Sequence, residues 1–173
     1  VMQQGVVQEL HIERTASCVL VGNVYLGRIV RILPGMQSAF VEIGLERTAF
    51  LHVADIWQPR ETATERPIEK VLAEGQSIVV QVVKDPIGTK GARLTTQISI
   101  PSRYLVLLPQ SRTVGVSARI EDEAERERLK QVVTDCVAAE GIEEVGGFIL
   151  RTAAEGAGKD EILVDIRYLR RLW

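Results

Sequence analysis

The sequence is poor in the residues that build metal centres and disulfide frameworks. Its 173 residues include only two cysteines and two histidines. Cys18 and Cys136 lie far apart, and neither has a second Cys or His at the spacing of a zinc motif. His11 and His52 cannot supply such a site alone. We therefore expect no metal site and no disulfide framework in this chain, with both cysteines as buried thiols.

Long apolar runs are missing as well. No stretch reaches the length of a membrane span, and residues 1–5 lack the basic-then-apolar layout of a signal peptide. Charged residues make up 25% of the chain and hydrophobic residues 46%, as in ordinary globular proteins. We therefore predict a soluble, cytoplasmic protein without a membrane partner, folded as one large domain or two small ones.

Aromatic residues and net charge are both low. Aromatics make up 5% of the chain, and 21 Lys and Arg face 23 Asp and Glu, for a net charge of -2. The charges are segregated, however: residues 86–119 contain no acid and five basic residues. Nucleic-acid binding therefore stays possible, although a solvated strand surface explains the same stretch equally well. The acidic run 121–125 is the expected start of a helix.

Residues 23–100 have the pattern of a small barrel. Strict alternation of apolar and polar residues predicts strands over 38–43 and 48–53, with Phe40 and Phe50 on the polar face. Further strands are predicted over 78–83 and 93–100, and residues 85–91 form a turn-rich loop. A short helix over 67–75 precedes the fourth strand. Five strands in this order are typical of an OB-type barrel.

The pattern changes after Pro101. Strands are predicted over 104–108, 113–120 and 148–152, and helices over 121–139 and 160–173. The first helix should bury Leu129, Val132, Val133, Cys136 and Val137, and the second should bury Leu163, Ile166, Leu169 and Leu172. The predicted fold class is therefore α+β, a five-stranded OB-type barrel followed by a small α/β unit.

Particular runs of residues resemble a known family. Residues 27–31, 38–44 and 49–56 resemble the S1-type RNA-binding OB domain. Residues 23–28, 34–37, 82–96, 101–106 and 149–156 are similar to the ribonuclease E/G family. The resemblance implies three parts: the end of a ribonuclease-H-like segment (1–18), the S1-type domain (19–100) and a 5′-sensor (101–173).

This family, as the resemblance implies, consists of bacterial Mg²⁺-dependent endoribonucleases that cut single-stranded RNA and respond to a 5′-monophosphate. They act in RNA processing and decay, including rRNA maturation and mRNA turnover. The catalytic aspartate motif and the Cys-Pro-x-Cys zinc link of the family do not occur in this sequence. We therefore expect an N-terminal fragment with no catalytic residues that is inactive alone, with Mg²⁺ and a structural Zn²⁺ belonging to the complete family protein.

The resemblance also assigns RNA-contacting residues in the barrel. Phe40 and Phe50 match the stacking positions of the family, and Lys90 matches an RNA-contacting lysine between glycines. Tyr25 is added as an extension of the stacking surface, although its strand has apolar residues on both faces. The alternatives are phenylalanines packed under a loop and a solvated loop lysine.

A second set of residues is assigned to the 5′-phosphate. Arg151 and Thr152 end a strand and precede a glycine-containing loop, where a guanidinium and backbone N–H groups can surround a phosphate. An ordinary surface arginine explains the same layout. The resemblance adds Val106 and Ser102 on the neighbouring strand, and some relatives have glycine at the Ser102 position.

One alternative function stays open. The chain can also be a non-catalytic RNA-binding adaptor whose α/β unit forms a homo-oligomer. The apolar stripe of the helix over 121–139, together with Trp57 or Trp173, would then belong to a subunit interface. A small-molecule hydrolase is disfavoured because the sequence contains no nucleophile-and-base constellation.

Overall fold

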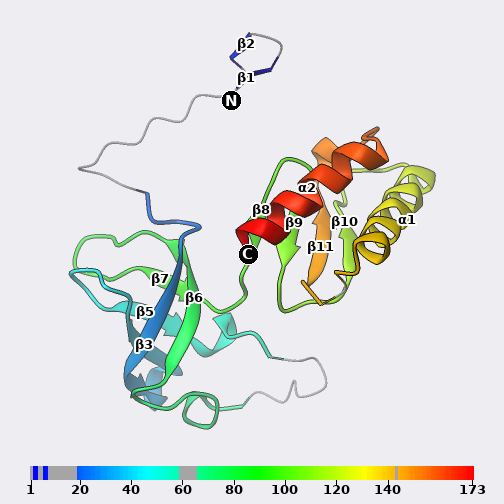
Figure 1. The fold of residues 1–173 in the computed structure, drawn as a ribbon. Helices are drawn as coiled ribbons and strands as arrows, with labels where there is room; N and C mark the ends of the chain where they lie inside the picture. Colours follow the sequence, from blue (N-terminus) through cyan, green and yellow to red (C-terminus); the bar gives the residue numbers. More distant parts are fainter. Residues whose placement is uncertain (1, 4–5, 8–18, 59–65, 143) are drawn as a thin grey trace.

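A computed structural model describes residues 2–3, 6–7, 19–58, 66–142 and 144–173 (Figure 1). At the N-terminus, β1 (Met2–Gln3) pairs with β2 (Val6–Val7) in antiparallel orientation. The other residues of the predicted ribonuclease-H-like segment (1–18), namely 1, 4–5 and 8–18, lie outside the described residues. Two units follow, and each has a separate cluster of buried hydrophobic side chains.

The first unit is a closed five-stranded barrel with strand order β3-β4-β5-β7-β6. Its strands are β3 (Val24–Leu33), β4 (Ser38–Glu42), β5 (Ala49–His52), β6 (Ser77–Lys84) and β7 (Arg93–Thr95). β5 and β7 pair in parallel, and the other neighbours are antiparallel. This closed five-stranded arrangement is an OB-type barrel, which confirms the predicted fold class.

Alternation along the strands separates the barrel interior from its outer face. Ala39, Val41, Ala49 and Leu51 are fully buried, whereas Phe40 and Phe50 between them are only half-buried. At Gly27 the interior has no room for a side chain, because a Cβ there would lie 2.6 Å from the Val41 side chain. The predicted polar-face position of both phenylalanines is therefore confirmed.

Two local predictions in the barrel are wrong. The helix over 67–75 is a single 3₁₀ turn, η4 (Ile68–Lys70), which buries Ile68. The strand over 93–100 ends at Thr95, because main-chain Asp55 accepts hydrogen bonds from Thr95 Oγ1 (2.8 Å) and Thr96 N (3.0 Å). These bonds divert the chain, which next enters a strand at β8 (Ile100–Pro101).

The second unit is a four-stranded sheet covered on one face by two helices. The sheet order is β10-β11-β9-β8. Its elements are β9 (Leu105–Leu108), β10 (Val114–Val116), α1 (Glu123–Glu140), β11 (Gly147–Leu150) and α2 (Lys159–Leu172). β10 and β11 are parallel, and β9 is antiparallel to both β11 and β8. The unit therefore has one covered and one open sheet face.

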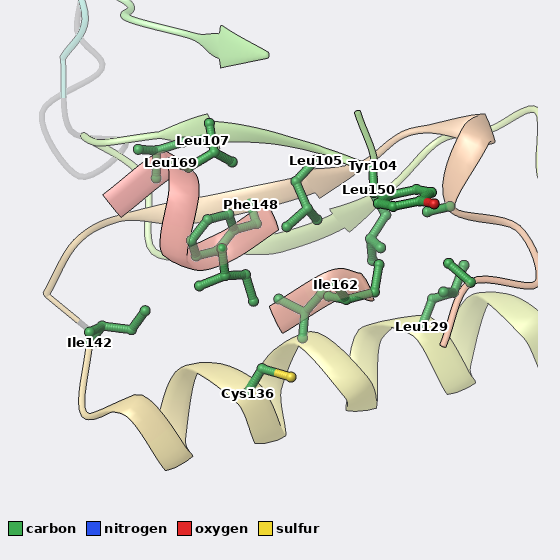
Figure 2. Close-up of a cluster of buried hydrophobic side chains, with 14 of the residues drawn as sticks. Tyr104, Leu105, Leu107, Leu129, Cys136, Ile142, Phe148, Leu150, Ile162 and Leu169 are labelled. Carbon is green, nitrogen blue, oxygen red and sulfur yellow. The ribbon is translucent and has the colours of Figure 1, made fainter. Parts of the chain in front are cut away.

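The helices bury one face of this sheet (Figure 2). Leu105 and Leu107 of β9 and Phe148 and Leu150 of β11 point into this core, while Val106 and Ile149 alternate to the open face. Helix residues complete the core: Leu129, Val133, Cys136, Ile162, Ile166 and Leu169. The predicted α1 stripe is thus confirmed as core, with Val132 and Val137 at its margin.

Several predicted details of this unit need correction. Leu172 is 57% exposed and Leu163 is only partly buried, whereas Ile162, one residue before Leu163, is fully buried in α2. The strand over 113–120 ends at Val116, because Ser117 and Ile120 form a turn (Ile120 N to Ser117 O, 3.1 Å) that buries Ile120. The strand over 148–152 ends at Leu150, where the 3₁₀ turn η5 (Thr152–Ala154) follows.

Both tryptophans are exposed, Trp57 by 40% and Trp173 by 51%. In contrast, the α1 stripe packs against its own sheet and is not available to a second subunit. Within the described ranges, no helix combines the length and the apolar character that a membrane crossing requires.

Candidate RNA-binding surface

A hollow of about 950 Å³ lies on the outer face of the barrel. Its walls come from β4, β5, the end of β6, the start of β7, the turn 34–36 and the loops 44–48 and 85–91. It brings together three of the four predicted RNA-binding residues, namely Phe40, Phe50 and Lys90. Residues separated by up to fifty positions in the sequence therefore share one concave surface.

Phe40 and Phe50 form the apolar floor of the hollow. They are direct cross-strand partners in the β4–β5 pair, with ring centroids 6.4 Å apart and planes inclined by 66°. This edge-to-face arrangement is favourable between aromatic rings and leaves part of each ring accessible. Met36 (60% exposed) and Ile87 (72% exposed) add apolar surface at the rim. The hollow therefore offers flat, apolar contacts of the kind that unstacked bases use.

Positive charge dominates the walls. The lining contains four cationic side chains, Arg47, Lys84, Lys90 and Arg93, and two anionic ones, Glu46 and Asp85, for a net charge of +2. Arg93 is paired with Asp55 at 2.8 Å, whereas no described acidic side chain pairs with Lys84 or Lys90. Lys84 and Lys90 are thus available to an anionic ligand.

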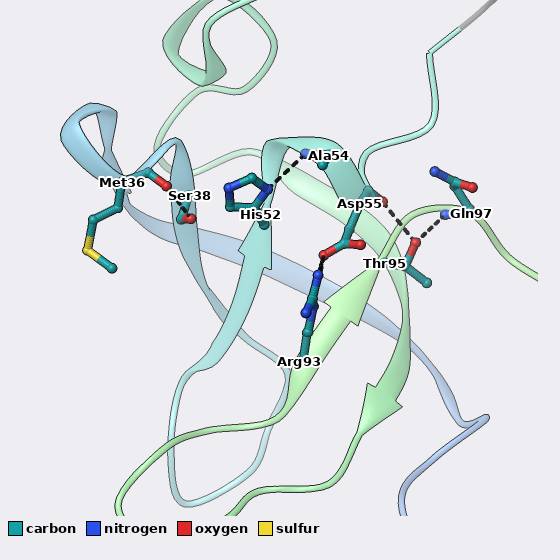
Figure 3. A network of polar contacts seen from close by, with 8 residues as sticks. All are labelled: Met36, Ser38, His52, Ala54, Asp55, Arg93, Thr95 and Gln97. Carbon is teal, nitrogen blue, oxygen red and sulfur yellow. Dashed lines mark hydrogen bonds and ion pairs between the residues drawn. The ribbon is translucent and has the colours of Figure 1, made fainter.

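A polar network fixes the rim near the end of β5 (Figure 3). The Nε and Nη2 atoms of Arg93 both donate to Oδ2 of Asp55, at 3.0 and 2.8 Å. His52 Nδ1 accepts a hydrogen bond from Ala54 N (3.1 Å), so the neutral ring carries its proton on Nε2. Asp55 and Arg93 therefore hold the 3₁₀ turn after β5 against β7 and orient the guanidinium beside the hollow.

Close main-chain contact holds the Lys90 loop against β5. A Cβ at Gly91 would lie 1.9 Å from the carbonyl oxygen of Thr48, so only glycine permits this approach. Phe50 N donates to Ala92 O (2.7 Å), and Arg47 Nη1 donates to Gly88 O. The loop that carries Lys90 is thus tied to the strand that carries Phe50.

Sequence reasoning left Arg47 out of the site and counted Arg93 only as part of the acid-free stretch. An arginine in a turn carries no local signal that distinguishes it from a solvated cation. Only the long-range contact of the loops 44–48 and 85–91 reveals Arg47 as part of the wall.

The structure does not bring Tyr25 into the hollow. Tyr25 pairs with Val80 across β3 and β6 and packs against the barrel core, partly buried. Its hydroxyl accepts a hydrogen bond from Asn23 Nδ2 at 3.3 Å. Tyr25 therefore lies apart from the Phe40–Phe50 pair.

The four residues assigned to a 5′-phosphate lie around the end of β11, and a hydrogen bond joins two of them, Arg151 and Ser102. Arg151 N donates to Tyr104 O (2.8 Å), and Arg151 Nη1 donates to Ser102 O. Val106 is the partner of Ile149 on the open sheet face, the face that Arg151 also shares by alternation. Thr152 Oγ1 lies 3.3 Å from Ser117 Oγ. Arg151 and Thr152 are exposed, and Val106 and Ser102 are half-buried.

The loop after Thr152 is anchored to α1 by one ion pair. Glu125 accepts a hydrogen bond from Gly156 N (2.8 Å) and pairs with Arg128 at 2.6 Å, while Arg128 Nη2 donates to Ala157 O (3.1 Å). The Arg128 guanidinium and the Gly156 N–H lower the pKa of Glu125 to about 2. The anchor therefore stays ionised at all ordinary pH values.

The first unit is thus an OB-type barrel whose outer face carries two accessible, paired phenylalanines beside Lys84 and Lys90. Residues 99–173 match the profile described as "Ribonuclease E/G family". Ribonuclease G of Escherichia coli strain K12 is 55% identical over 98% of this chain and 35% of its own length. Ribonuclease E of a Nostoc species is 42% identical over 88% of the chain and 22% of its length.

The chain belongs to the ribonuclease E/G family. It spans about a third of the length of the ribonuclease G proteins that it matches, 35% for the Escherichia coli protein. Among solved structures, GSP13 of Bacillus subtilis aligns at 23% identity over 44% of this chain and 54% of that chain. The TM-score of this alignment is 0.35.

Proposed function

We propose that this chain is the RNA-binding and 5′-monophosphate-sensing N-terminal region of a single-strand-specific endoribonuclease that acts in RNA processing and decay. The observation that carries the proposal is the hollow on the barrel, where Phe40 and Phe50 lie among a net charge of +2. Membership of the ribonuclease E/G family supports the same conclusion.

In this proposal the barrel holds the RNA strand. Bases stack on Phe40 and Phe50, at about 1 to 3 kcal/mol per base and with little sequence preference, because every base has a π-face. Lys84 and Lys90 contact backbone phosphates as point charges. Arg47 in the loop 44–48 and Arg93 at the start of β7 border the path, and both are oriented by their contacts within the protein.

The end of β11 receives the 5′-terminal phosphate. The Arg151 guanidinium uses one N–H for Ser102 O and keeps further N–H groups for phosphate oxygens. Thr152 adds a hydroxyl, and Val106 offers an apolar contact to the first nucleotide. Each charge-assisted hydrogen bond contributes about 1.5 to 3 kcal/mol, enough to distinguish a phosphate from a hydroxyl.

Catalysis is assigned to parts of the family proteins that this chain does not span. Among the described residues, no group of three His, Cys, Asp or Glu side chains lies close enough to hold a metal ion. The Mg²⁺ and Zn²⁺ that a complete family protein is expected to hold are assigned to those parts as well. Incubation of this chain with Mg²⁺ and labelled RNA should leave the RNA intact, and cleavage would contradict this assignment.

The 5′-end assignment is tested by the affinities of two oligonucleotides that differ only in a 5′-monophosphate or a 5′-hydroxyl, each labelled at the 3′ end. The intact chain should bind the phosphorylated RNA more tightly, and Arg151→Ala should remove that preference while leaving affinity for the hydroxylated RNA unchanged. Arg171→Ala, an exposed arginine of α2, is the matched control. Equal loss of preference in the control would refute the assignment.

The adaptor alternative predicts a different outcome of the same assay. An RNA-binding adaptor would bind both oligonucleotides equally well, because it has no site that recognises the 5′-phosphate.

A cytoplasmic location and roles in rRNA maturation and mRNA turnover remain predictions of the endoribonuclease proposal.

A further inference from the structure

Asp165 of α2 is a buried carboxylate that the proposed function does not use. It is 9% exposed, and none of the ion pairs among the described residues includes it. Burying a charged group is costly unless hydrogen bonds replace its hydration. Its Oδ2 atom accepts three of them, from Ser102 Oγ (2.6 Å), Tyr104 N (2.8 Å) and Leu105 N (3.1 Å).

All three donors belong to one short turn, residues 102–105, which connects β8 to β9. The turn is also closed on itself, since Ser102 N donates to Leu105 O at 2.8 Å. One helical turn before Asp165, Glu161 accepts a hydrogen bond from the Tyr104 hydroxyl at 2.8 Å. Two acidic side chains on the same face of α2 therefore hold a single turn in place.

The same turn holds Arg151. Its main-chain N–H donates to Tyr104 O, and its guanidinium donates to Ser102 O. Arg151 is otherwise exposed at the end of β11. The direction of its guanidinium therefore depends on where the 102–105 turn places the Ser102 carbonyl oxygen.

The Ser102 hydroxyl has no hydrogen left for a phosphate. Its two neighbours are acceptors, Asp165 Oδ2 at 2.6 Å and Leu105 O at 3.0 Å, and a hydroxyl has one hydrogen to donate. The main-chain N–H of Ser102 is committed to Leu105 O. Ser102 therefore acts on a ligand through the carbonyl group that orients Arg151.

We propose that Asp165 is the positioning residue of the 5′-phosphate site: by holding the 102–105 turn through three hydrogen bonds, it fixes the Ser102 carbonyl that aims the Arg151 guanidinium. This inference rests on the proposed function of Arg151. α2 contributes none of the residues proposed to touch the phosphate. Through Asp165, this helix nevertheless controls how well the site distinguishes a 5′-monophosphate from a 5′-hydroxyl.

Two substitutions separate the position of the carboxylate from its charge. Asp165→Asn removes the charge but keeps an acceptor oxygen at the same distance from the main chain. Asp165→Glu keeps the charge but moves the oxygens by one methylene group, which displaces the turn. If Asp165 acts by position, the Asn variant retains the preference for 5′-monophosphorylated over 5′-hydroxyl RNA within about threefold, and the Glu variant loses about tenfold or more of it.

The readouts exclude a simple loss of stability. Affinity for the 5′-hydroxyl RNA, which depends on the barrel, should stay unchanged in both variants, and thermal melting should show a folded protein. The amide resonances of Tyr104 and Leu105 in a ¹⁵N-labelled chain report whether their hydrogen bonds persist; they should move in the Glu variant more than in the Asn variant. Arg167→Ala removes the ion pair of α2 with Glu140 and serves as the control on the same helix.

The possible outcomes distinguish this inference from the proposed function. If the intact chain shows no preference for the 5′-monophosphate, the proposed function fails first. If the preference exists and Asp165→Glu retains it, or Asp165→Asn loses it as fully as Arg151→Ala does, the positioning role is overturned. A loss in Arg167→Ala as large as in Asp165→Glu would equally overturn it.

Discussion

Replacing either Phe40 or Phe50, the two phenylalanines of the hollow, by alanine should weaken single-stranded RNA binding without unfolding the barrel. Phe40 and Phe50 lie on the outer face, while the interior is filled by Ala39, Val41, Ala49 and Leu51. Truncation of a half-buried ring leaves no enclosed cavity, so the stability loss should fall below the roughly 3 to 5 kcal/mol typical of a buried phenylalanine. The substitutions should therefore change the affinity for RNA much more than the free energy of unfolding.

The size of the effect follows from the stacking energy. Loss of one stacked base costs about 1 to 3 kcal/mol, which corresponds to a rise in Kd of roughly 5-fold to 150-fold. The two rings also form an edge-to-face pair with centroids 6.4 Å apart, which stabilises the free protein and holds both rings in place. Phe40→Ala and Phe50→Ala should therefore be non-additive, and the double variant should lose less than the sum.

Fluorescence anisotropy with an unstructured, 3′-labelled oligonucleotide measures these affinities. Leu26→Ala is the control, because Leu26 is an apolar residue on the outer face of the barrel, 72% exposed and paired with Val79 away from the hollow. Phe40→Tyr should retain binding, since the ring persists. If Leu26→Ala weakens binding as much as Phe40→Ala does, or if both phenylalanine variants bind normally, the stacking assignment is refuted.

Three further predictions concern charge, pH and backbone packing. If Arg47, Lys84 and Lys90 each neutralise one phosphate, a plot of the logarithm of the binding constant against the logarithm of salt concentration should have a slope of about -2. Lys90→Ala should make this slope shallower by about 0.7. A flat response would rule out the electrostatic role of the hollow. The pKa of Glu125 is lowered from 4.5 to about 2 in the folded chain, so the ionised carboxylate stabilises the fold fully above pH 4.5 and loses this effect as the pH falls towards 2. The difference in Tm between the wild type and Glu125→Gln should therefore shrink over that range. A constant difference would contradict the role of the ion pair. Gly91→Ala should lower stability by about 1 to 3 kcal/mol in denaturant unfolding and weaken RNA binding, because its Cβ would clash with Thr48 O, whereas Gly35→Ala, in open space, should change neither.

Local periodicity predicted most of the architecture because the barrel and the sheet each have one buried face. Alternation placed Phe40 and Phe50 outside, and a helical stripe placed Leu129, Val133 and Cys136 inside. In both cases the residue's own neighbours in the sequence carry the information. The OB-type strand order followed from the number and sequence of these elements.

The failures have long-range causes. The strand beginning at Arg93 ends early because Thr95 and Thr96 bond to Asp55, forty residues earlier in the chain. Leu172 completes an apolar helical pattern but is 57% exposed at the end of α2. Aspartate is a residue type typical of solvated helix positions, yet Asp165 is buried by a turn about sixty residues earlier in the chain. Patterns within one element contain no information about such partners.

The central claim, one RNA strand held by the barrel with its 5′ end at β11, is tested most directly by NMR titration of the ¹⁵N-labelled chain. A short RNA with a 5′-monophosphate should shift the amide resonances of Phe40, Phe50, Lys90 and Arg151 together. The same RNA with a 5′-hydroxyl should shift only the barrel resonances. Identical shifts of Arg151 with both RNAs, or the largest shifts at Leu26 and Val79 instead of the hollow, would contradict the account.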